Sequence, residues 1–307
     1  MKRAVAVCCA AWLAGALPSV AQAAPITIGL FAPSAAFPST AARVELANRL
    51  GGELGKALNV SGSGRVYARA ADFAAAVKKG EVTLALVDPA YLAGAGGNPE
   101  VVAVAVSSDD KTAGPWQFVA RGGATIADLQ GKHVLVPNLG GREVDFVLNV
   151  LLDGGVGRDF FAKIEPAPDT ASALAALALG KADAVVVPVT AALPPGTAAV
   201  PAAPALPALP NPVLVVYGAM SEQDLRVVRE AAKRFQGDAT IAGFRAPGGE
   251  SDGEALRGVA RRFSAAVKRG PFLIPAVRLV VGDLLEGRTF AIERTPATAF
   301  AIAPTTR

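Results

Sequence analysis

The sequence predicts an α/β fold made of two similar lobes, each a mostly parallel sheet flanked by helices. Short apolar runs alternate along the chain with segments of helical periodicity, which is typical of strands buried between helices. One unit, a helix closed by glycine and followed by a buried strand, occurs twice. After an N-terminal export segment, roughly 280 residues remain, a length that suits one or two domains.

The N-terminus has the three parts of a secretory signal. Residues 1–3 carry two positive charges, residues 4–20 form an apolar run, and residues 21–23 read Ala-Gln-Ala. An uncleaved membrane anchor is the alternative, but the run is short for a span of roughly 20 residues and contains Pro18. We therefore expect residues 1–23 to be a signal peptide and the mature protein to be periplasmic.

The rare residue types exclude several classes of site. Cys8 and Cys9 are the only cysteines, and they lie inside the apolar run, so we expect neither a lipoprotein nor a disulfide. His133 is the only histidine, which excludes a histidine metal cluster and leaves one candidate base for a Ser-His-Asp relay. We expect no catalytic residue, no metal site and no cofactor.

The charge balance gives no sign of a nucleic-acid partner. Without Lys2 and Arg3, the formal net charge falls from +4 to +2. The basic residues are scattered, and the densest sites, 261–262 and 268–269, fit the solvated face of one helix. The apolar content of 52% fits a soluble chain with a large core, which we expect to be a monomer.

The first part of the chain reads as an opening strand-helix unit of an α/β domain. The run 26–31 is short and apolar and ends in Ala-Pro-Ser, which indicates a buried strand and a turn. Ser39 or Thr40 is a plausible N-cap for the helix that follows. We expect strands over 26–31, 66–68 and 82–87, and helices over 40–58 and 72–79.

The repeated unit is the most informative feature. The helix 72–79 is closed by Gly80 and followed by a buried strand, and the helix 170–179 is closed by Gly180 and followed by another. A glycine after a helix is common in any α/β fold, so each copy alone is weak evidence. The two copies lie about 100 residues apart, too far for a solenoid repeat, and indicate one copy in each lobe.

The rest of the chain yields further elements. Prolines crowd the stretch 191–212, which excludes a regular helix or a central strand and predicts an extended Pro/Ala-rich connection. Ser221 is a plausible N-cap for the helix after it. We expect extended segments over 116–121, 133–136 and 213–217, a helical turn over 126–130, an apolar helical stripe through Phe146, Val147, Val150 and Leu151, and helices over 221–235 and 254–268.

Three segments carry a resemblance to a known family. Residues 128–134 read Asp-Leu-Gln-Gly-Lys-His-Val, residues 173–184 follow Ala-Leu-x-x-Leu-x-x-Gly-x-Ala-Asp-Ala, and residues 88–91 read Asp-Pro-Ala-Tyr. In this order the chain resembles the phosphate/phosphonate-type substrate-binding proteins of ABC transporters, within the type 2 periplasmic binding superfamily. The resemblance covers about Ile26 to Phe235.

The resemblance implies a type 2 periplasmic-binding-protein-like fold with two lobes joined by two crossing strands, near 116–121 and 212–217. Lobe 1 would comprise 24–120 plus 211–307, and lobe 2 would comprise 121–210. The implied function is capture of a small ligand, with a phosphate- or phosphonate-like anion as one class, for an ABC permease.

Two departures motivate an alternative. The turn 138–143 reads Asn-Leu-Gly-Gly-Arg-Glu in place of a serine- and threonine-rich turn, and the Pro/Ala-rich connection is unusual for the family. A third departure, Thr83 where relatives usually carry aspartate, leaves the fold expectation unchanged. We therefore keep open an envelope sensor or adaptor that uses the same fold without transport.

Ligands in open α/β sheets bind beyond the carboxyl ends of the strands, where loops lead into helices. Three such ends can be identified, after residues 31, 87 and 136. The predicted ligand-binding residues at these ends are Ser34, Asp88, Tyr91, Asn138, Gly140, Gly141 and Arg142.

The turn 138–142 is the best candidate for an anion site. Two glycines before a helix expose backbone N–H groups at its positive end, and Arg142 adds a bidentate donor. An ordinary helix start fits the pattern equally well, because Glu143 and Asp145 offset the charge.

The other candidates also have structural alternatives. Tyr91 can stack on a ligand or form part of the rim of the core. Asp88 can accept a ligand amine or cap the turn that begins at Pro89. For His133 and Asp183 we favour structural roles over chemistry.

Overall fold

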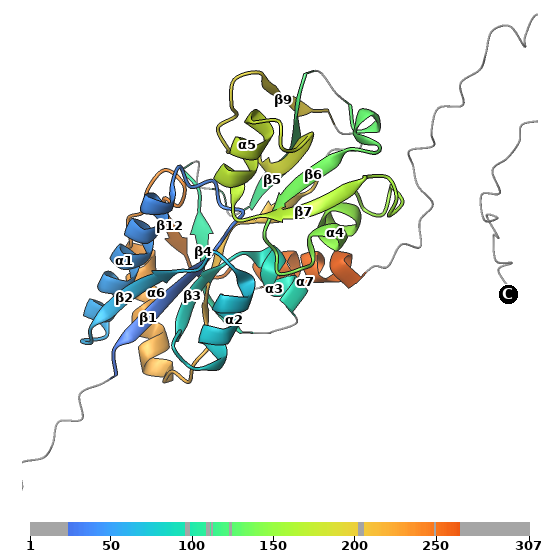
Figure 1. Cartoon of the computed structure of the whole chain (residues 1–307). Coiled ribbons are helices and arrows are strands. Elements are labelled where there is room, and N and C mark those ends of the chain that lie inside the picture. Colours follow the sequence, from blue (N-terminus) through green and yellow to red (C-terminus); the bar gives the residue numbers. More distant parts are fainter. Residues whose placement is uncertain are drawn as a thin grey trace, which may run out of the picture. The chain divides into compact units, whose positions relative to one another are not determined.

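The structure is a computed structural model that describes residues 24–95, 99–108, 111, 113–122, 125–201, 206–248 and 250–264 (Figure 1). The expected signal peptide and the residues after 264 lie outside this set. The described part contains two six-stranded mixed sheets with helices against them, so the α/β prediction with two sheets is confirmed. The expectation that each sheet is mostly parallel is wrong, because each has two parallel and three antiparallel strand pairings. No helix in it is both long enough and apolar enough to cross a membrane.

The first sheet has the strand order β12-β4-β11-β3-β1-β2. Strands β1, β2 and β3 run parallel, whereas β11 lies antiparallel between β3 and β4. Its strands are β1 (Ile26–Phe31), β2 (Gly62–Val66), β3 (Leu84–Val87), β4 (Glu100–Val106), β11 (Val213–Val216) and β12 (Gly243–Arg245).

Helices cover both faces of this sheet. One core holds α1 (Thr40–Ala57) and α6 (Glu222–Arg234) against side chains such as Leu30. The other core holds α2 (Ala70–Lys78) and α3 (Pro89–Ala95) around the rings of Phe31, Phe73 and Tyr91. Neighbouring residues Leu30 and Phe31 thus serve opposite faces, as the strand period of two requires.

The second strand differs from the prediction. We expected it over 66–68, but β2 is Gly62–Val66, of which the prediction contains Val66 alone. Helix α1 packs so closely on β2 that a Cβ on Gly62 would lie 1.9 Å from the carbonyl oxygen of Gly51. Glycines weaken a strand in isolation, and here they permit the close approach that a sequence pattern does not show.

The second sheet has the order β10-β5-β8-β6-β7, with β9 also paired to β5. Strand β6 runs parallel to β7 and β8, whereas β5 is antiparallel to its three partners. Its strands are β5 (Ala113–Arg121), β6 (His133–Pro137), β7 (Lys163–Ala167), β8 (Ala184–Pro188), β9 (Thr197–Val200) and β10 (Ala208–Pro210).

The helical segments of this sheet include α5 (Thr170–Ala178), which Asp169 caps. A short 3₁₀ turn, η1, spans Ala127–Leu129, and α4 (Glu143–Asp145) runs on into a π-helical segment, η2 (Phe146–Leu151). Every residue of η2 is buried, which confirms the expected apolar stripe.

The repeated unit is confirmed. Helix α2, Gly80 and β3 belong to the first sheet, and α5, Gly180 and β8 belong to the second. The φ angles of Gly80 and Gly180 are +73° and +71°, a left-handed conformation that glycine adopts at helix ends without steric cost.

Two connections join the sheets. Residues 107–112 link β4 to β5, and Asn211 and Pro212 link β10 to β11. All of β5 pairs within the second sheet, so the first connection lies before Trp116 and not at 116–121, where a crossing strand was expected. The lobe limits at residues 120 and 211 stay a prediction. In its described residues, the Pro/Ala-rich stretch contributes the extended strands β9 and β10 beside β5, in line with the expected extended connection.

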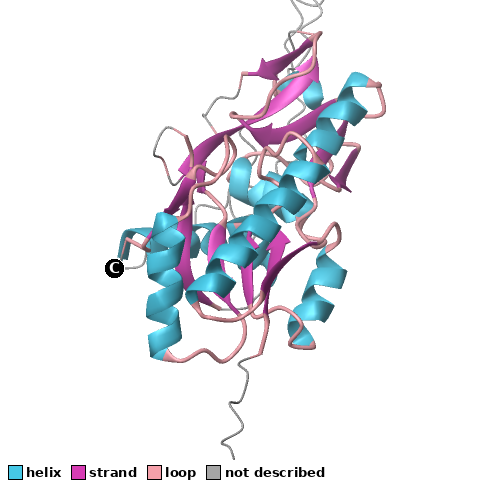
Figure 2. Cartoon of the chain, turned by 90° about the vertical axis from the view of Figure 1, so that its left-hand side faces the viewer, coloured by secondary structure: helices cyan, strands magenta, loops and turns pink. Residues whose placement is uncertain are grey.

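Helix α7 (Glu250–Ser264) packs on elements of both sheets. It contacts α3, which follows a strand of the first sheet, and η2 and β10 on the side of the second. Figure 2 shows the same part of the chain turned by 90°. Phe263 on α7 stacks on Phe146 of η2, with the ring centroids 6.1 Å apart.

Candidate functional site

The loops that follow β1 and β3 meet in a buried contact. The backbone N–H of Ser34 donates to Asp88 Oδ2 at 2.8 Å, and the Ser34 hydroxyl donates to Asp88 Oδ1. Both residues are almost completely buried. The structure thus brings together two of the residues expected at the site, and the Asp88 carboxylate bonds Ser34 rather than capping α3.

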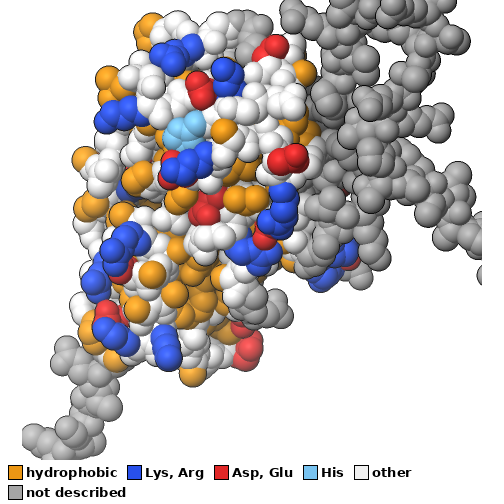
Figure 3. All heavy atoms as spheres, turned by 45° about the vertical axis from the view of Figure 1, so that its right-hand side comes forward, with side chains coloured by type: hydrophobic (Ala, Val, Ile, Leu, Met, Phe, Trp, Pro, Cys, Tyr) orange, Lys and Arg blue, Asp and Glu red, His pale blue; other side chains and the backbone are white. Residues whose placement is uncertain are grey.

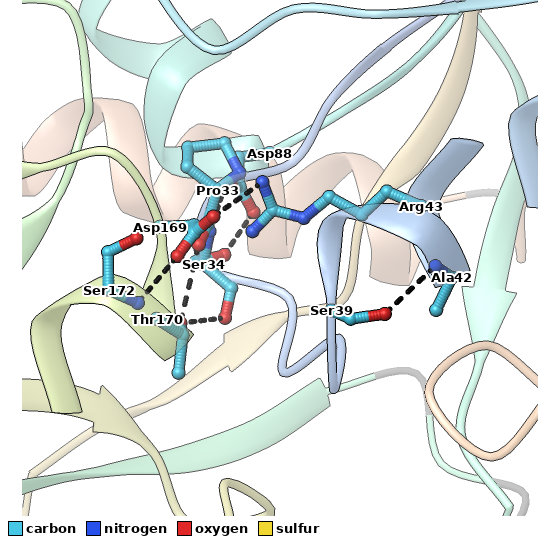
Figure 4. Close-up of polar contacts among 9 residues, drawn as sticks. All are labelled: Pro33, Ser34, Ser39, Ala42, Arg43, Asp88, Asp169, Thr170 and Ser172. Atoms are coloured by element: carbon cyan, nitrogen blue, oxygen red, sulfur yellow. Dashed lines mark hydrogen bonds and ion pairs between the residues drawn. The ribbon is translucent and has the colours of Figure 1, made fainter. Parts of the chain in front are cut away.

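The second sheet contributes to the same contact through the N-terminus of α5 (Figure 4). The Thr170 hydroxyl donates to the carbonyl oxygen of Ser34 at 2.9 Å, and the Thr170 N–H donates to that of Pro33 at 3.0 Å. Asp169 caps α5 by accepting the N–H of Ser172 at 2.7 Å. The strand-end loops of the two sheets therefore touch directly.

Arg43 completes this cluster from helix α1. Its Nη1 lies 3.0 Å from Asp169 Oδ2, and the two side chains are only 6% and 12% exposed. Its guanidinium also lies over the Phe37 ring, 5.7 Å from the centroid. We call Ser34, Arg43, Asp88, Asp169 and Thr170 the seam cluster.

Burial governs the electrostatics of the seam cluster. Desolvation raises the pKa of Asp88 to about 6, against the bonds from Ser34 and the positive charge of Arg43, which lower it. Desolvation lowers the pKa of Arg43, while Asp169 and then Asp88 raise it. Asp88 is thus the group of the seam cluster that titrates at mildly acidic pH.

Arg43, Asp169 and Thr170 were missed from the sequence, although a signal was present. Arg43 stands three, four and seven residues before Leu46, Ala47 and Leu50, so it lies on the apolar face of α1. A cation on such a face needs a buried partner. The sequence does not show that this partner is Asp169.

Tyr91 and Arg142 lie at a second contact between elements of the two sheets. A Cβ on Gly140 would lie 3.2 Å from Tyr91 Cε2. Arg142 Nη1 donates to the carbonyl oxygen of Gly94 on α3 at 3.2 Å, and its Nε donates to Asp145 Oδ2 at 3.0 Å. Its guanidinium carbon lies 5.3 Å from the ring centroid of Phe263 on α7. Arg142 therefore braces α3 and α7 against the second sheet.

The turn expected to bind an anion holds a carboxylate of the chain. The N–H groups of Leu139 and Gly141 donate to Glu143 Oε1 at 2.7 and 3.2 Å, and the N–H of Gly140 donates to Asn138 Oδ1 at 2.9 Å. Glu143 is 5% exposed. An external anion at this turn would have to displace Glu143.

A groove of about 690 Å³ lies beside the seam cluster. It is lined by the loop after β1, both connections between the sheets, the end of β8 and residues 239–241. Ser34 is the one residue of the predicted set among its described lining residues, and it also belongs to the seam cluster. Across the described part of the chain, no group of three or more metal-ligating side chains is placed to hold an ion.

His133 and Asp183 have local structural contacts. Asp183 Oδ2 accepts the N–H of His133 at 2.9 Å, and His133 Nε2 lies 2.8 Å from Glu165 Oε2 on the neighbouring strand β7. The face in Figure 3 carries charged side chains of both signs interspersed, with no broad basic area.

No protein-family model and no curated protein matches the chain. Among solved structures, a protein of Xanthomonas citri bound to ATP, a binding protein component of an ABC phosphonate transporter from Pseudomonas aeruginosa, and PhnD1 of Prochlorococcus marinus in complex with methylphosphonate are similar to it. Each has a TM-score of 0.59 and 12% identity over 78% of this chain and over 96%, 87% and 98% of its own length, respectively. The fold implied by the resemblance is confirmed: this chain has the two-lobed fold of the type 2 periplasmic binding proteins.

Proposed function

We propose that the chain is an extracytoplasmic solute-binding protein that captures a small molecule between its two lobes for an ABC permease. The observation that carries this proposal is the direct contact of the strand-end loops, where Thr170 bonds Ser34 and Asp169 pairs with Arg43. In α/β sheets these loops form the ligand sites, so two sets of them face each other here. The expected signal peptide gives further support, because it implies export.

The ligand class is argued from the resemblance and from the cations and N–H groups near the lobe contact. The resemblance suggests a phosphate- or phosphonate-like anion, and the PhnD1 protein of Prochlorococcus marinus was solved with methylphosphonate. In this chain the turn 138–143 uses its N–H groups on Glu143 and Asn138. The buried cation at the seam is Arg43, and its guanidinium is paired with the carboxylate of Asp169.

A thermal-shift screen of the chain from Ala24 onward tests this function. The panel contains phosphate, phosphite and methylphosphonate, together with neutral and cationic solutes of similar size. We expect at least one solute to raise the melting temperature, because a ligand at a hundred times its Kd adds about 2.7 kcal/mol to stability. A panel without any stabilising solute would count against the proposal.

The sensor or adaptor alternative is favoured by one observation. The seam cluster joins the two sheets through groups of the protein alone, by the hydrogen bonds of Ser34 with Asp88 and Thr170 and by the pair of Arg43 with Asp169, although Arg43 Nε is buried without a hydrogen-bond partner. A protein in this state can present a fixed surface to another envelope protein. A pull-down from envelope extract separates the two: recovery of a permease supports transport, and recovery of a sensor kinase or assembly protein without a permease supports the alternative.

A further inference from the structure

Helix α7 reaches from the first sheet to the second. Strand β12, at the edge of the first sheet, ends at Arg245, and α7 begins at Glu250, so the chain itself ties the helix to that sheet. Leu256, Val259 and Phe263 are three and four residues apart, which places them on one face of the helix. Val259 and Phe263 are buried, and Leu256 is half-buried. This face is the side of α7 that packs on the rest of the protein.

The beginning of this face belongs to the first sheet. Leu256 packs against the core that contains the rings of Phe31, Phe73 and Tyr91. Helix α7 also contacts α3, which directly follows β3 of the same sheet. Because both the chain connection and this packing attach α7 to the first sheet, we expect a rotation of one lobe against the other to carry α7 with the first sheet.

The last turn of α7 contacts the side of the second sheet through the ring of Phe263. This ring stacks on Phe146 of η2, with the centroids 6.1 Å apart and 29° between the ring planes. The guanidinium carbon of Arg142 lies 5.3 Å from the centroid of the same ring. Aromatic stacking and cation–π attraction both act only at such short range. The ring is therefore held by two interactions that a separation of the sheets would break.

Arg142 joins the same contact to α3. Its Nη1 donates to the carbonyl oxygen of Gly94 at 3.2 Å, while its Nε donates to Asp145 on the side of the second sheet at 3.0 Å. A Cβ on Gly94 would lie 3.1 Å from Arg142 Cγ and 3.9 Å from Phe263 Cε1. Helices α3 and α7 and the residue before α4 thus meet at one point. We call Gly94, Arg142, Phe146 and Phe263 the α7 junction.

The α7 junction shares no residue with the seam cluster. The seam cluster joins the loops after β1 and β3 to the start of α5, whereas the α7 junction joins α3 and α7 to η2. The two sheets are therefore held together at two separate places. Phe263 is almost completely buried, so a separation of the lobes at the junction would expose its ring to water, which is unfavourable.

We propose that α7 is a strap that holds the two lobes together without a solute, and that its last turn leaves Phe146 when the lobes open. The attachment to the first sheet stays in place, and the contact of Phe263 is the one that is released. This inference goes beyond the proposed solute capture, because it concerns the equilibrium between the closed and the open form of the chain alone. Its test therefore contains no solute.

Spin labels on α7 test which lobe the helix moves with. Ala255 lies on the exposed side of α7 and can carry a label as Ala255→Cys, because the chain from Ala24 onward contains no native cysteine. One protein pairs this label with Lys78→Cys on α2, and a second protein pairs it with Leu179→Cys beside α5. Pulsed electron paramagnetic resonance measures both distances. Opening should add a second distance between residues 255 and 179 and leave the distance between residues 255 and 78 unchanged.

The decisive variant is Phe263→Leu, which removes the stacking and the cation–π contact but keeps an apolar side chain. It is combined with Arg43→Met, because an intact seam cluster would keep the lobes closed by itself. Phe160→Leu is the matched control: Phe160 is buried and packs edge-on against Phe161, which in turn stacks on Phe118 of β5. Relative to Arg43→Met alone, we expect Phe263→Leu to raise the ratio of open to closed protein at least about tenfold and Phe160→Leu to leave it unchanged.

A milder change of the seam cluster guards against a loss of folding. If circular dichroism shows that the Arg43→Met proteins do not fold, Thr170→Val replaces this change, since it removes only the hydroxyl bond to the carbonyl oxygen of Ser34.

The outcomes decide the strap independently of the solute screen. A ratio that Phe263→Leu leaves unchanged, including the absence of any open population, overturns the strap, as does an equal rise with Phe160→Leu. A second distance between residues 255 and 78 also overturns it, because α7 would then leave the first sheet. A failed solute screen leaves the strap intact, and a failed strap leaves solute capture intact.

Discussion

Arg43 on α1 and Asp169 at the start of α5 form a buried ion pair that joins the two sheets, with 3.0 Å between Nη1 and Oδ2. The pair belongs to a continuous set of polar contacts. Asp169 is followed by Thr170, whose hydroxyl donates a hydrogen bond to the carbonyl oxygen of Ser34. The N–H of Ser34 in turn donates to Asp88. Residues far apart in the sequence thus depend on one another for the polar partners that burial makes necessary.

Replacing Arg43 should strongly destabilise the protein. Arg43→Met keeps the helix propensity and the apolar part of the side chain, but it leaves the Asp169 carboxylate buried without its cation. Removal of one partner from a buried pair costs about 3–5 kcal/mol. The measurement is the free energy of unfolding in urea. The control is Lys56→Met at an exposed position on the same helix, which should change it by less than about 1 kcal/mol; equal effects of the two variants would argue against the pair.

Asp88 should make stability depend on pH in the acidic range. Its folded pKa of about 6 lies above the ordinary value of 3.8, so the folded state binds the proton more tightly than the unfolded state. Its contribution is full below about pH 4 and is lost as the pH rises through about 6, a loss on the order of 2–3 kcal/mol.

Asp88→Asn removes this titration while keeping an oxygen that can accept the Ser34 N–H. Between about pH 4 and about pH 7 the wild type should lose stability that the variant keeps, so the unfolding free energy of the variant should rise relative to that of the wild type. Urea unfolding at several pH values measures it. Parallel pH curves for the two proteins would show that Asp88 does not titrate in this window.

Alanine substitutions at two adjacent glycines of α1 should change the stability of the protein in opposite directions. A Cβ on Gly51 would lie 2.5 Å from the backbone of Ser63 on β2, so Gly51→Ala should force the helix away and cost about 1–3 kcal/mol. A Cβ on Gly52 would meet nothing within 4 Å, so Gly52→Ala should stabilise the helix by about 0.5–1 kcal/mol. Thermal unfolding of the two variants provides the comparison, and effects of the same sign would refute the close packing of α1 on β2.

Glu143 should act as an internal anion at the turn 138–143. Glu143→Ala leaves the buried N–H of Leu139 without its acceptor, at a cost of about 1–3 kcal/mol. Acetate should recover part of the lost melting temperature, relative to chloride at the same ionic strength, because it supplies the missing carboxylate. Glu53→Ala on the exposed face of α1 is the control and should show no acetate effect. If acetate fails to help Glu143→Ala, the turn does not select an anion.

The local sequence pattern was sufficient to predict the elements that have a strong apolar periodicity or a capping residue at their start. Strand β1, helix α1 with its Ser39 cap and helix α6 with its Ser221 cap follow the expected residues closely. The repeated helix-glycine-strand unit correctly indicated two sheets, because Gly80 and Gly180 each follow a helix in the left-handed conformation, one in each sheet.

The elements that local pattern did not give depend on their surroundings. No strand was expected over β4, although its apolar run is buried, or over β7, an edge strand with Lys163, Glu165 and Pro166 in five residues. Strand β2 was misplaced because its glycines matter only once α1 packs against them.

The site was partly accessible from the sequence. The rule that ligands lie at strand ends selected Ser34 and Asp88, which the structure places in contact. It did not reveal that Glu143 fills the glycine turn, nor that Arg43 reaches Asp169, since each depends on which side chain arrives from elsewhere in the chain. The groove is formed by segments far apart in the sequence, and no single motif encodes it.

The most direct test of the account measures the distance between the lobes. The chain from Ala24 onward contains no native cysteine, so spin labels at Lys78→Cys, on the first sheet's α2, and Leu179→Cys, beside the second sheet's α5, report on the two lobes alone. Pulsed electron paramagnetic resonance should give one narrow distance distribution in the otherwise native protein and a second, separate population when Arg43→Met breaks the buried pair. A solute that stabilises the protein should remove that second population. A single unchanged distance in both proteins, with and without solute, would contradict two lobes that close on a ligand.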